Sequence, residues 1–191
     1  VGDSKLVSYQ NLATMVADGV GFIAPASKTY VSADDLRAVP GGQAVVVDYV
    51  AGRDAGKPAE TRGVWRVWED TMVLAGPRKA DPVVTVRRVF VHSSARAQAA
   101  ATSRDRKLDR ARDDLGRLER GLGSRHYPDA EAVGARIAAI GKARRITGWV
   151  QARVGTDPAT DKPTLSWQFD QAMIDAEVAT DGWYALLTDL P

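Results

Sequence analysis

The sequence contains no cysteine and only two histidines, His92 and His126. The lack of cysteine excludes disulfide frameworks, thiol nucleophiles and thiolate metal sites, and it agrees with a cytoplasmic location. No stretch approaches the roughly 18 consecutive apolar residues that would span a bilayer, and no leader with a cleavage site opens the chain. From these absences we expect a soluble, unexported protein with no membrane partner.

The composition that remains is that of a folded protein. Of the 191 residues, 45% are hydrophobic and 26% are charged, which allows a packed core beneath a soluble surface. The length suits one domain of ordinary size or two small ones. The chain begins with Val1 and not with Met, and it stops soon after a strand-like run, so we expect a piece of a longer protein.

The net charge of +2 hides an uneven distribution of charged residues. Residues 94–145 contain 13 Lys and Arg against seven Asp and Glu, whereas residues 155–191 contain one Lys against seven acidic residues. A basic middle segment favours a polyanion as a partner. The alternative is that long helices carry many solvated charges, paired along the helix as Asp113 and Arg117 would be. The composition leaves both interpretations open.

Residues 1–24 predict the end of a strand, a helix and a second strand. Ser8 is placed to cap the helix and Gly19 to end it. Such a unit is typical of an α/β sheet, which binds its ligands at the carboxyl ends of strands. Asp3 stands at such an end.

Residues 43–93 predict antiparallel strands. The runs at 43–50, 64–69 and 83–92 are apolar or β-branched, and segments rich in Gly, Pro and Asp separate them. In the last run we expect Val84, Val86 and Phe90 to share one face.

Residues 94–145 predict a helical hairpin, because apolar residues recur at steps of three and four in two arms. They are Leu108, Ala111, Leu115, Leu118 and Leu122 in the first arm, and Val133, Ile137 and Ile140 in the second. The segment that ends at Pro128 interrupts the helix, and Asp129 can cap the second arm. Clean alternation at 148–154 and 164–170 then predicts a β-hairpin, followed by a short helix near 171–177 and a strand at 183–188.

Few motifs of catalysis are present. Gly2, Asp3 and Ser4 match the opening motif of Gly-Asp-Ser hydrolases, but that family takes its base from a late Asp-x-x-His motif, and no histidine follows His126. We keep serine hydrolysis as an alternative. There is no Walker-type phosphate loop, no G-x-G-x-x-G and no His pair at zinc-binding spacing.

Two distant segments carry a resemblance to a known family. Residues 1–13 read VGDSKLVSYQNLA and residues 18–25 read DGVGFIAP, and at the far end residues 181–190 read DGWYALLTDL. These segments resemble the second-aspartate region and the Asp-Gly-aromatic strand of DDE transposases, in the branch of the bacterial insertion-sequence family numbered four. The segment between them resembles the insertion that this branch places between its second Asp and its Glu.

The resemblance implies an α/β fold that is part of an RNase H-like core, with an inserted antiparallel β-rich region and a helical hairpin. It divides the chain into core residues 1–30, an insertion over 31–180 whose hairpin spans about 94–145, and a return strand at 181–191. The family's first Asp belongs upstream of Val1 and its Glu downstream of Pro191.

The resemblance also implies a chemistry. Three carboxylates of a DDE enzyme hold two Mg²⁺ or Mn²⁺ ions, which activate a water or a 3′ hydroxyl for attack on a DNA phosphodiester. Asp3 matches the second of these aspartates and is the candidate catalytic and metal-binding residue. With one carboxylate of three, the isolated chain is expected to be inactive.

The family's insertion helps to hold the transposon end, so the basic residues of the hairpin are candidates for DNA contact. They are Arg104, Arg106, Lys107, Arg110, Arg112, Arg117, Arg120, Arg144 and Arg145. The implied partners are the terminal inverted repeats and target DNA, with a homodimer as the full-length form and a bacterial cytoplasm, at the nucleoid, as the location. The other interpretation left open is a non-enzymatic DNA-binding or interaction remnant of such an element.

Overall fold

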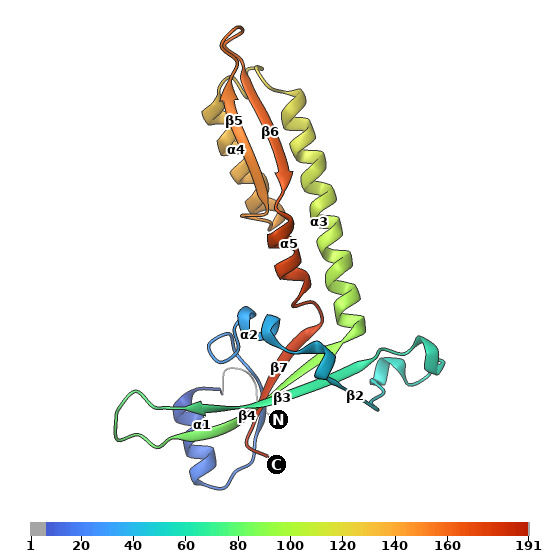
Figure 1. Ribbon diagram of the computed structural model, residues 1–191, viewed down its shortest axis with the longest axis vertical. Coiled ribbons are helices and arrows are strands. Elements are labelled where there is room, and N and C mark those ends of the chain that lie inside the picture. The colour runs from blue at the N-terminus through green and yellow to red at the C-terminus, as the bar shows by residue number, and fades with distance from the viewer. Residues whose placement is uncertain (1–6, 191) are drawn as a thin grey trace. The chain divides into compact units, whose positions relative to one another are not determined.

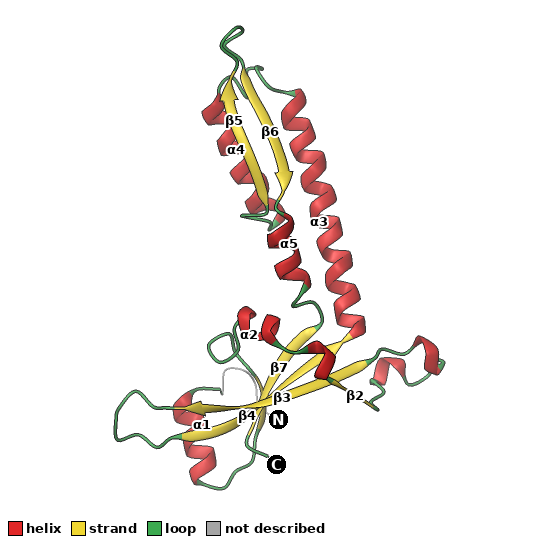
Figure 2. Ribbon diagram, viewed as in Figure 1, coloured by secondary structure: helices red, strands yellow, loops and turns green. Residues whose placement is uncertain are grey.

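The computed structural model describes residues 7–190, and the chain divides into two compact units (Figure 1). The first unit comprises Val1–Ala99 and Ala179–Pro191, and the second comprises Ala100–Val178. The boundary therefore falls within the segment expected to be the insertion, since residues 31–99 belong to the first unit. Figure 2 shows a sheet with short helices and long loops in the first unit, and helices with a β-hairpin in the second.

The first unit is built on a five-stranded antiparallel sheet with the order β1-β7-β4-β3-β2. Its strands are β1 (Ile23–Pro25), β2 (Val45–Val47), β3 (Trp65–Leu74), β4 (Val84–Ser93) and β7 (Trp183–Thr188). The last strand of the chain lies inside the sheet, where it pairs with β1 and with β4. The structure is thus a mixed α/β fold, and residues from both ends of the chain form the same sheet.

One face of this sheet carries most of the core of the first unit. Val84, Val86 and Phe90 of β4 are 3%, 1% and 1% exposed, which confirms the face predicted for them. Leu187 of β7 and Leu12 of α1 (Tyr9–Ala17) are fully buried in the cluster that contains Val84 and Val86, whereas Phe90 packs in a neighbouring cluster with Ala185. Burying a side chain of this size contributes about 1.5–3 kcal/mol to stability.

The caps predicted for α1 are confirmed. The Ser8 hydroxyl accepts a hydrogen bond from the Asn11 amide at 3.3 Å, and Gly19 adopts a left-handed conformation with φ of +66°. The strand predicted at the end of 1–24 forms only from Ile23 onward. The strand end predicted at Asp3 lies outside the described residues.

A second short helix, α2 (Ala33–Ala38), is absent from the sequence prediction. Ser32 and Asp35 cap its first turn reciprocally, and hydrogen bonds from Ser32 are the main cause that lowers the pKa of Asp35. Arg88 of β4 binds Asp70 of β3 through Nε at 2.7 Å and Asp35 through Nη1 at 3.1 Å, so that it joins α2 to the sheet. Short 3₁₀ turns follow at η2 (Gly41–Gln43), η3 (Gly52–Asp54) and η4 (Ala59–Thr61).

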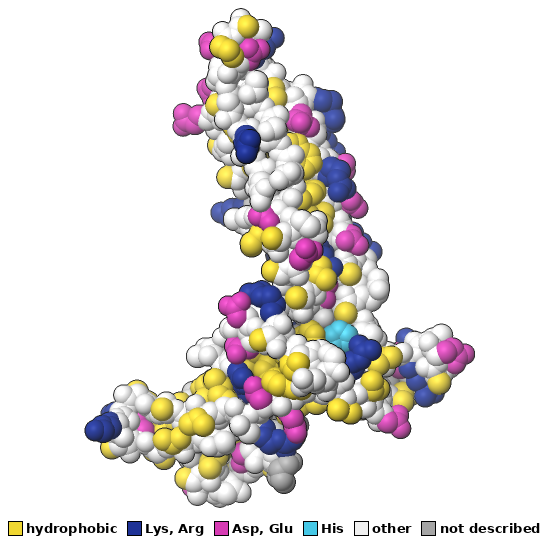
Figure 3. Space-filling view, viewed as in Figure 1, with side chains coloured by type: hydrophobic (Ala, Val, Ile, Leu, Met, Phe, Trp, Pro, Cys, Tyr) yellow, Lys and Arg dark blue, Asp and Glu magenta, His cyan; other side chains and the backbone are white. Residues whose placement is uncertain are grey.

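The apolar run at 43–50 forms less strand than predicted. Only Val45–Val47 pairs, at the edge of the sheet, and Val45 and Val46 are 66% and 61% exposed. An edge strand has a neighbour on one side only, which leaves these valines open. Figure 3 shows apolar side chains gathered over the sheet of the first unit.

The second unit contains the predicted helical hairpin and β-hairpin. Its elements are α3 (Ser94–Arg120, which begins in the first unit), α4 (Ala130–Arg144), β5 (Val150–Thr156), β6 (Pro163–Phe169) and α5 (Gln171–Val178). The two apolar stripes pack together, with Leu115 and Val133 fully buried, and the Asp129 carboxylate caps α4 by accepting from the Ala132 amide at 2.8 Å. Trp167 and Phe169 of β6 add to this core.

The search for membrane spans gives a negative result over residues 7–190, where every helix is too short or too polar to cross a bilayer.

Candidate nucleic-acid interface

The candidate catalytic residue, Asp3, lies outside the described residues. Within residues 7–190, no three His, Asp or Glu side chains come together in a group that could hold a metal ion. The described side chains therefore do not fit a Mg²⁺ or Mn²⁺ centre by themselves.

The basic residues predicted to contact DNA are described, and five of the nine line one hollow in the second unit. Arg106, Lys107 and Arg110 come from α3, and Arg144 and Arg145 come from the end of α4. The hollow measures about 360 Å³, and Ser103 and Ala143 complete its lining. No acidic side chain is among these lining residues. We call this hollow the basic pocket.

The structure places the other four predicted residues elsewhere. Arg112 pairs with Asp109 at 2.7 Å and lies 5.6 Å above the ring of Phe169. Arg117 binds Asp114, and Arg120 belongs to the last turn of α3.

Arg104 differs from all the others because it is buried, with 8% of its surface exposed. It stands four residues before Leu108 and seven before Ala111, so it continues the apolar stripe of α3 toward its N-terminus. A buried side chain is not available to a phosphate, and we leave Arg104 out of the candidate interface.

Asp114 is a buried carboxylate beside the basic pocket that the sequence interpretation did not single out. It is 8% exposed, and its carboxylate accepts from Arg144 Nε of α4 at 2.8 Å and from Arg117 Nη1 at 3.3 Å. The hydrogen bond from Arg144 is the largest cause that lowers the pKa of Asp114. Arg117 thus pairs with Asp114 and not with Asp113, the partner considered from spacing. The sequence feature that could have indicated Asp114 is its position next to Leu115, on the side of α3 that faces the core.

Most of the basic side chains that line the pocket are not paired with a described carboxylate. Among the described residues, Arg106, Lys107, Arg110 and Arg145 make no side-chain hydrogen bond or ion pair. Arg144 uses only Nε on Asp114, so that both of its Nη groups are open. This cluster differs from the paired arginines of the same helix, and it concentrates positive potential in one place.

The backbone of Arg145 is also unusual. It ends α4 in a left-handed conformation, with φ of 57° and ψ of 45°, and its amide bonds to the Lys142 carbonyl at 3.2 Å. Glycine is the residue that helices most often place in this conformation.

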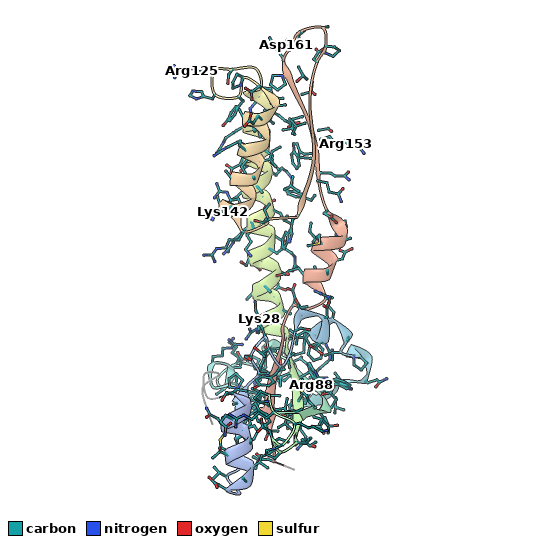
Figure 4. The ribbon with its side chains drawn as sticks, turned by 90° about the vertical axis from the view of Figure 1, so that its left-hand side faces the viewer. Lys28, Arg88, Arg125, Lys142, Arg153 and Asp161 are labelled. Atoms are coloured by element: carbon teal, nitrogen blue, oxygen red, sulfur yellow. The ribbon has the colours of Figure 1, made fainter. Side chains whose placement is uncertain are left out.

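The outward side of the β-hairpin provides a contrast. Gln151, Arg153 and Gln168 lie there, and Arg153 has no ion-pair partner among residues 7–190. Lys142 directly precedes the pocket residues 143–145. Figure 4 shows Lys142 and Arg153 extending to opposite sides of the second unit. A single arginine on that side supplies a natural control for the five cations of the pocket.

Comparisons of the chain with models of protein families, with curated proteins and with solved structures found no match.

Proposed function

We propose that this chain is part of a bacterial DNA transposase of the DDE class, and that its second unit holds DNA through the basic pocket and the adjoining cations of α3. The sequence segments described above support the class. The observation that carries the DNA contact is the group of four unpaired cations, together with Arg144, around a hollow without acidic lining.

The physical reason is the charge of the duplex. Double-stranded DNA carries one negative charge for about each 1.7 Å of its axis, and cations that neutralise its phosphates release bound counterions. Unpaired arginines can make this exchange without first losing an ion pair within the protein. The paired residues Arg112 and Arg117 would have to give up Asp109 and Asp114.

In this proposal Asp3 is the second of three carboxylates that hold two Mg²⁺ or Mn²⁺ ions, and the proposed core is RNase H-like. Such ions, if held there, would supply Lewis-acid chemistry for the cleavage of a phosphodiester. The part that this chain's described residues take is to bind and orient the DNA. The whole enzyme would work as a dimer that joins two transposon ends.

The DNA contact is tested by fluorescence anisotropy with a labelled duplex over a range of salt concentrations. We expect the logarithm of the association constant to fall with the logarithm of salt at a slope of about −4 to −5, as about five phosphate contacts require. Charge reversal by Arg110→Glu should weaken binding at least about tenfold, because it removes one contact and adds a repulsion. The matched control Arg153→Glu makes the same change in net charge on the other side of the unit and should have a much smaller effect. Binding that ignores salt, or equal losses in both variants, would contradict the proposal.

The transposase assignment is tested by sequencing the DNA that flanks the gene. We expect an upstream strand that ends in Asp, a downstream helix with a Tyr-Arg-Glu-Lys motif, and bordering inverted repeats. A flank with an intact reading frame that lacks these features would leave a DNA-binding remnant as the better description.

A further inference from the structure

The guanidinium of Arg144 is anchored at its Nε by a carboxylate of the neighbouring helix. Its Nε donates to Asp114 Oδ2 at 2.8 Å, and Asp114 is itself 8% exposed on the neighbouring helix. A bond at Nε leaves the outer edge of the planar guanidinium, with one N–H from each of its two Nη groups, unused by the carboxylate. Those groups have no partner among the described residues, and Arg144 lines the basic pocket. Two parallel N–H groups of this kind match two oxygens of a phosphate.

Arg145 lines the pocket, and its backbone has a left-handed conformation that is unfavourable for arginine. At φ of 57° its Cβ crowds the following carbonyl, and a glycine at this place would have no such cost. Its side chain is exposed, lines the basic pocket, and makes no ion pair within residues 7–190. Residues in strained backbone conformations cluster at ligand-binding sites, where the strain energy is offset by the rest of the fold and the geometry serves binding.

The pocket has space for a ligand. Its volume of about 360 Å³ equals the liquid volume of about twelve water molecules. Arg106, Lys107 and Arg110 of α3 face the end of α4 across it, so that cations from two helices converge on one position.

We propose that the basic pocket is a specific site for one backbone phosphate of DNA, gripped by Arg144 and Arg145, with Asp114 as the residue that positions Arg144. This inference rests on the proposed function, and it adds the ligand group, its two binding residues and the residue behind them. Asp114 does not touch the phosphate. It acts by setting the plane of the Arg144 guanidinium.

The first test uses Arg145→Gly, which separates stability from binding. Glycine relieves the left-handed backbone, so we expect the midpoint of thermal unfolding to rise by roughly 4 °C. It also removes a phosphate contact, so we expect DNA binding to weaken about tenfold and the salt slope to become less steep by about one. Arg153→Gln, measured in parallel, should keep the affinity within about twofold. A variant that is more stable and binds DNA as tightly as the wild type would overturn the proposal.

The second test uses Asp114→Asn, for which general electrostatics and positioning predict opposite results. The substitution makes the protein more positive, so a diffuse attraction would strengthen DNA binding. The positioning role predicts weaker binding, about fivefold, because the neutral amide no longer orients Arg144. Circular dichroism at the assay temperature establishes that the variant is folded. Arg144→Lys keeps the charge and loses the fork, so it should also weaken binding, and normal affinity in Arg144→Lys would overturn the bidentate grip.

A third measurement makes the failure of this inference distinguishable from failure of the proposed function. Inorganic phosphate, at an ionic strength matched with chloride, should raise the unfolding midpoint of the wild type more than that of Arg144→Lys. If phosphate does so but no duplex binds, the phosphate site stands and the DNA function falls. If duplex binds the wild type, Arg145→Gly, Asp114→Asn and Arg144→Lys equally, DNA binding stands and the phosphate site falls.

Discussion

At the scale of single residues, two glycines share a left-handed backbone but differ in their surroundings. Gly182 has φ of +79°, and a Cβ there would lie 2.8 Å from Ser93 O, 2.8 Å from Ala97 Cβ and 2.9 Å from His92 Nε2. Gly19 has φ of +66° with no atom within 4 Å of such a Cβ. The first position therefore demands glycine for both conformation and space, and the second for conformation alone.

We predict that Gly182→Ala lowers the free energy of unfolding by about 3 kcal/mol, because backbone strain and a forced contact add. Gly19→Ala should cost only about 1 kcal/mol, from the left-handed backbone. Urea denaturation of both variants measures the difference. Equal losses would mean that the crowding around Gly182 relaxes freely.

His92 is a second residue with a defined environment. It lies in β4 with its ring centroid 5.0 Å from that of Trp183, and its Nδ1 finds no hydrogen-bond partner among residues 7–190. Burial, assisted by the positive charge of Arg66, lowers the pKa of His92 below its usual value. The folded protein thus favours the neutral imidazole.

The lowered pKa predicts a pH dependence of stability. An unfolded histidine has a pKa of about 6.5, so the unfolded chain binds the proton first as the pH falls. The stability that neutral His92 contributes is present above about pH 6.5 and is lost as the pH falls through its folded pKa. In urea titrations at pH 7.5 and pH 5, His92→Gln should lose less stability than the wild type over this interval. Parallel losses in the two proteins would show that His92 does not carry the effect.

At the scale of elements, α3 and α4 formed as predicted because their apolar residues follow the helical repeat. Leu115 is fully buried at the centre of the core of the second unit, whereas Met173 of α5 is 44% exposed. The same repeat includes Arg104, however, and only the packed structure shows that this arginine lies on the buried stripe.

We predict that Leu115→Ala destabilises the second unit by about 2–5 kcal/mol, the cost of a lost side chain and the cavity that it leaves. The control Met173→Ala should change the free energy of unfolding by about 0.5 kcal/mol or less, because its side chain is largely in water already. Tryptophan emission, to which Trp149 and Trp167 of this core contribute, follows the transition. A small effect of Leu115→Ala would indicate that the core is not tightly packed.

Shorter elements were harder to predict. A helix of six residues, such as α2, spans fewer than two turns and has no apolar repeat to reveal it. The valines of β2 look like a buried strand in sequence but lie at an edge, because burial depends on which strands and helices are neighbours.

At the scale of the whole molecule, we expect this chain to bind DNA without catalysing its cleavage. One carboxylate cannot hold the two metal ions of a DDE site, so we predict that this chain with Mg²⁺ or Mn²⁺ binds duplex DNA without nicking it. The measurement is conversion of supercoiled plasmid to the open circle, with Asp3→Ala as the control. Nicking that depends on Asp3 would contradict this prediction.

The sequence by itself determined the elements whose signal is local. The repeats of α3 and α4, the alternation of β5 and β6, and the caps at Ser8 and Asp129 each depend on residues a few positions apart. The basic composition of residues 94–145 and the proposed role of Asp3 also come from the sequence alone.

Only the tertiary structure decided the relations between distant residues. The place of β7 between β1 and β4, and the bond between Asp114 and Arg144 across 30 residues, result from packing that no local pattern encodes. The same packing determines which of the residues predicted to contact DNA is buried, which are paired with carboxylates, and which line the basic pocket. The physical reason is that helix and strand periodicity acts along the chain, whereas burial and charge pairing act through space.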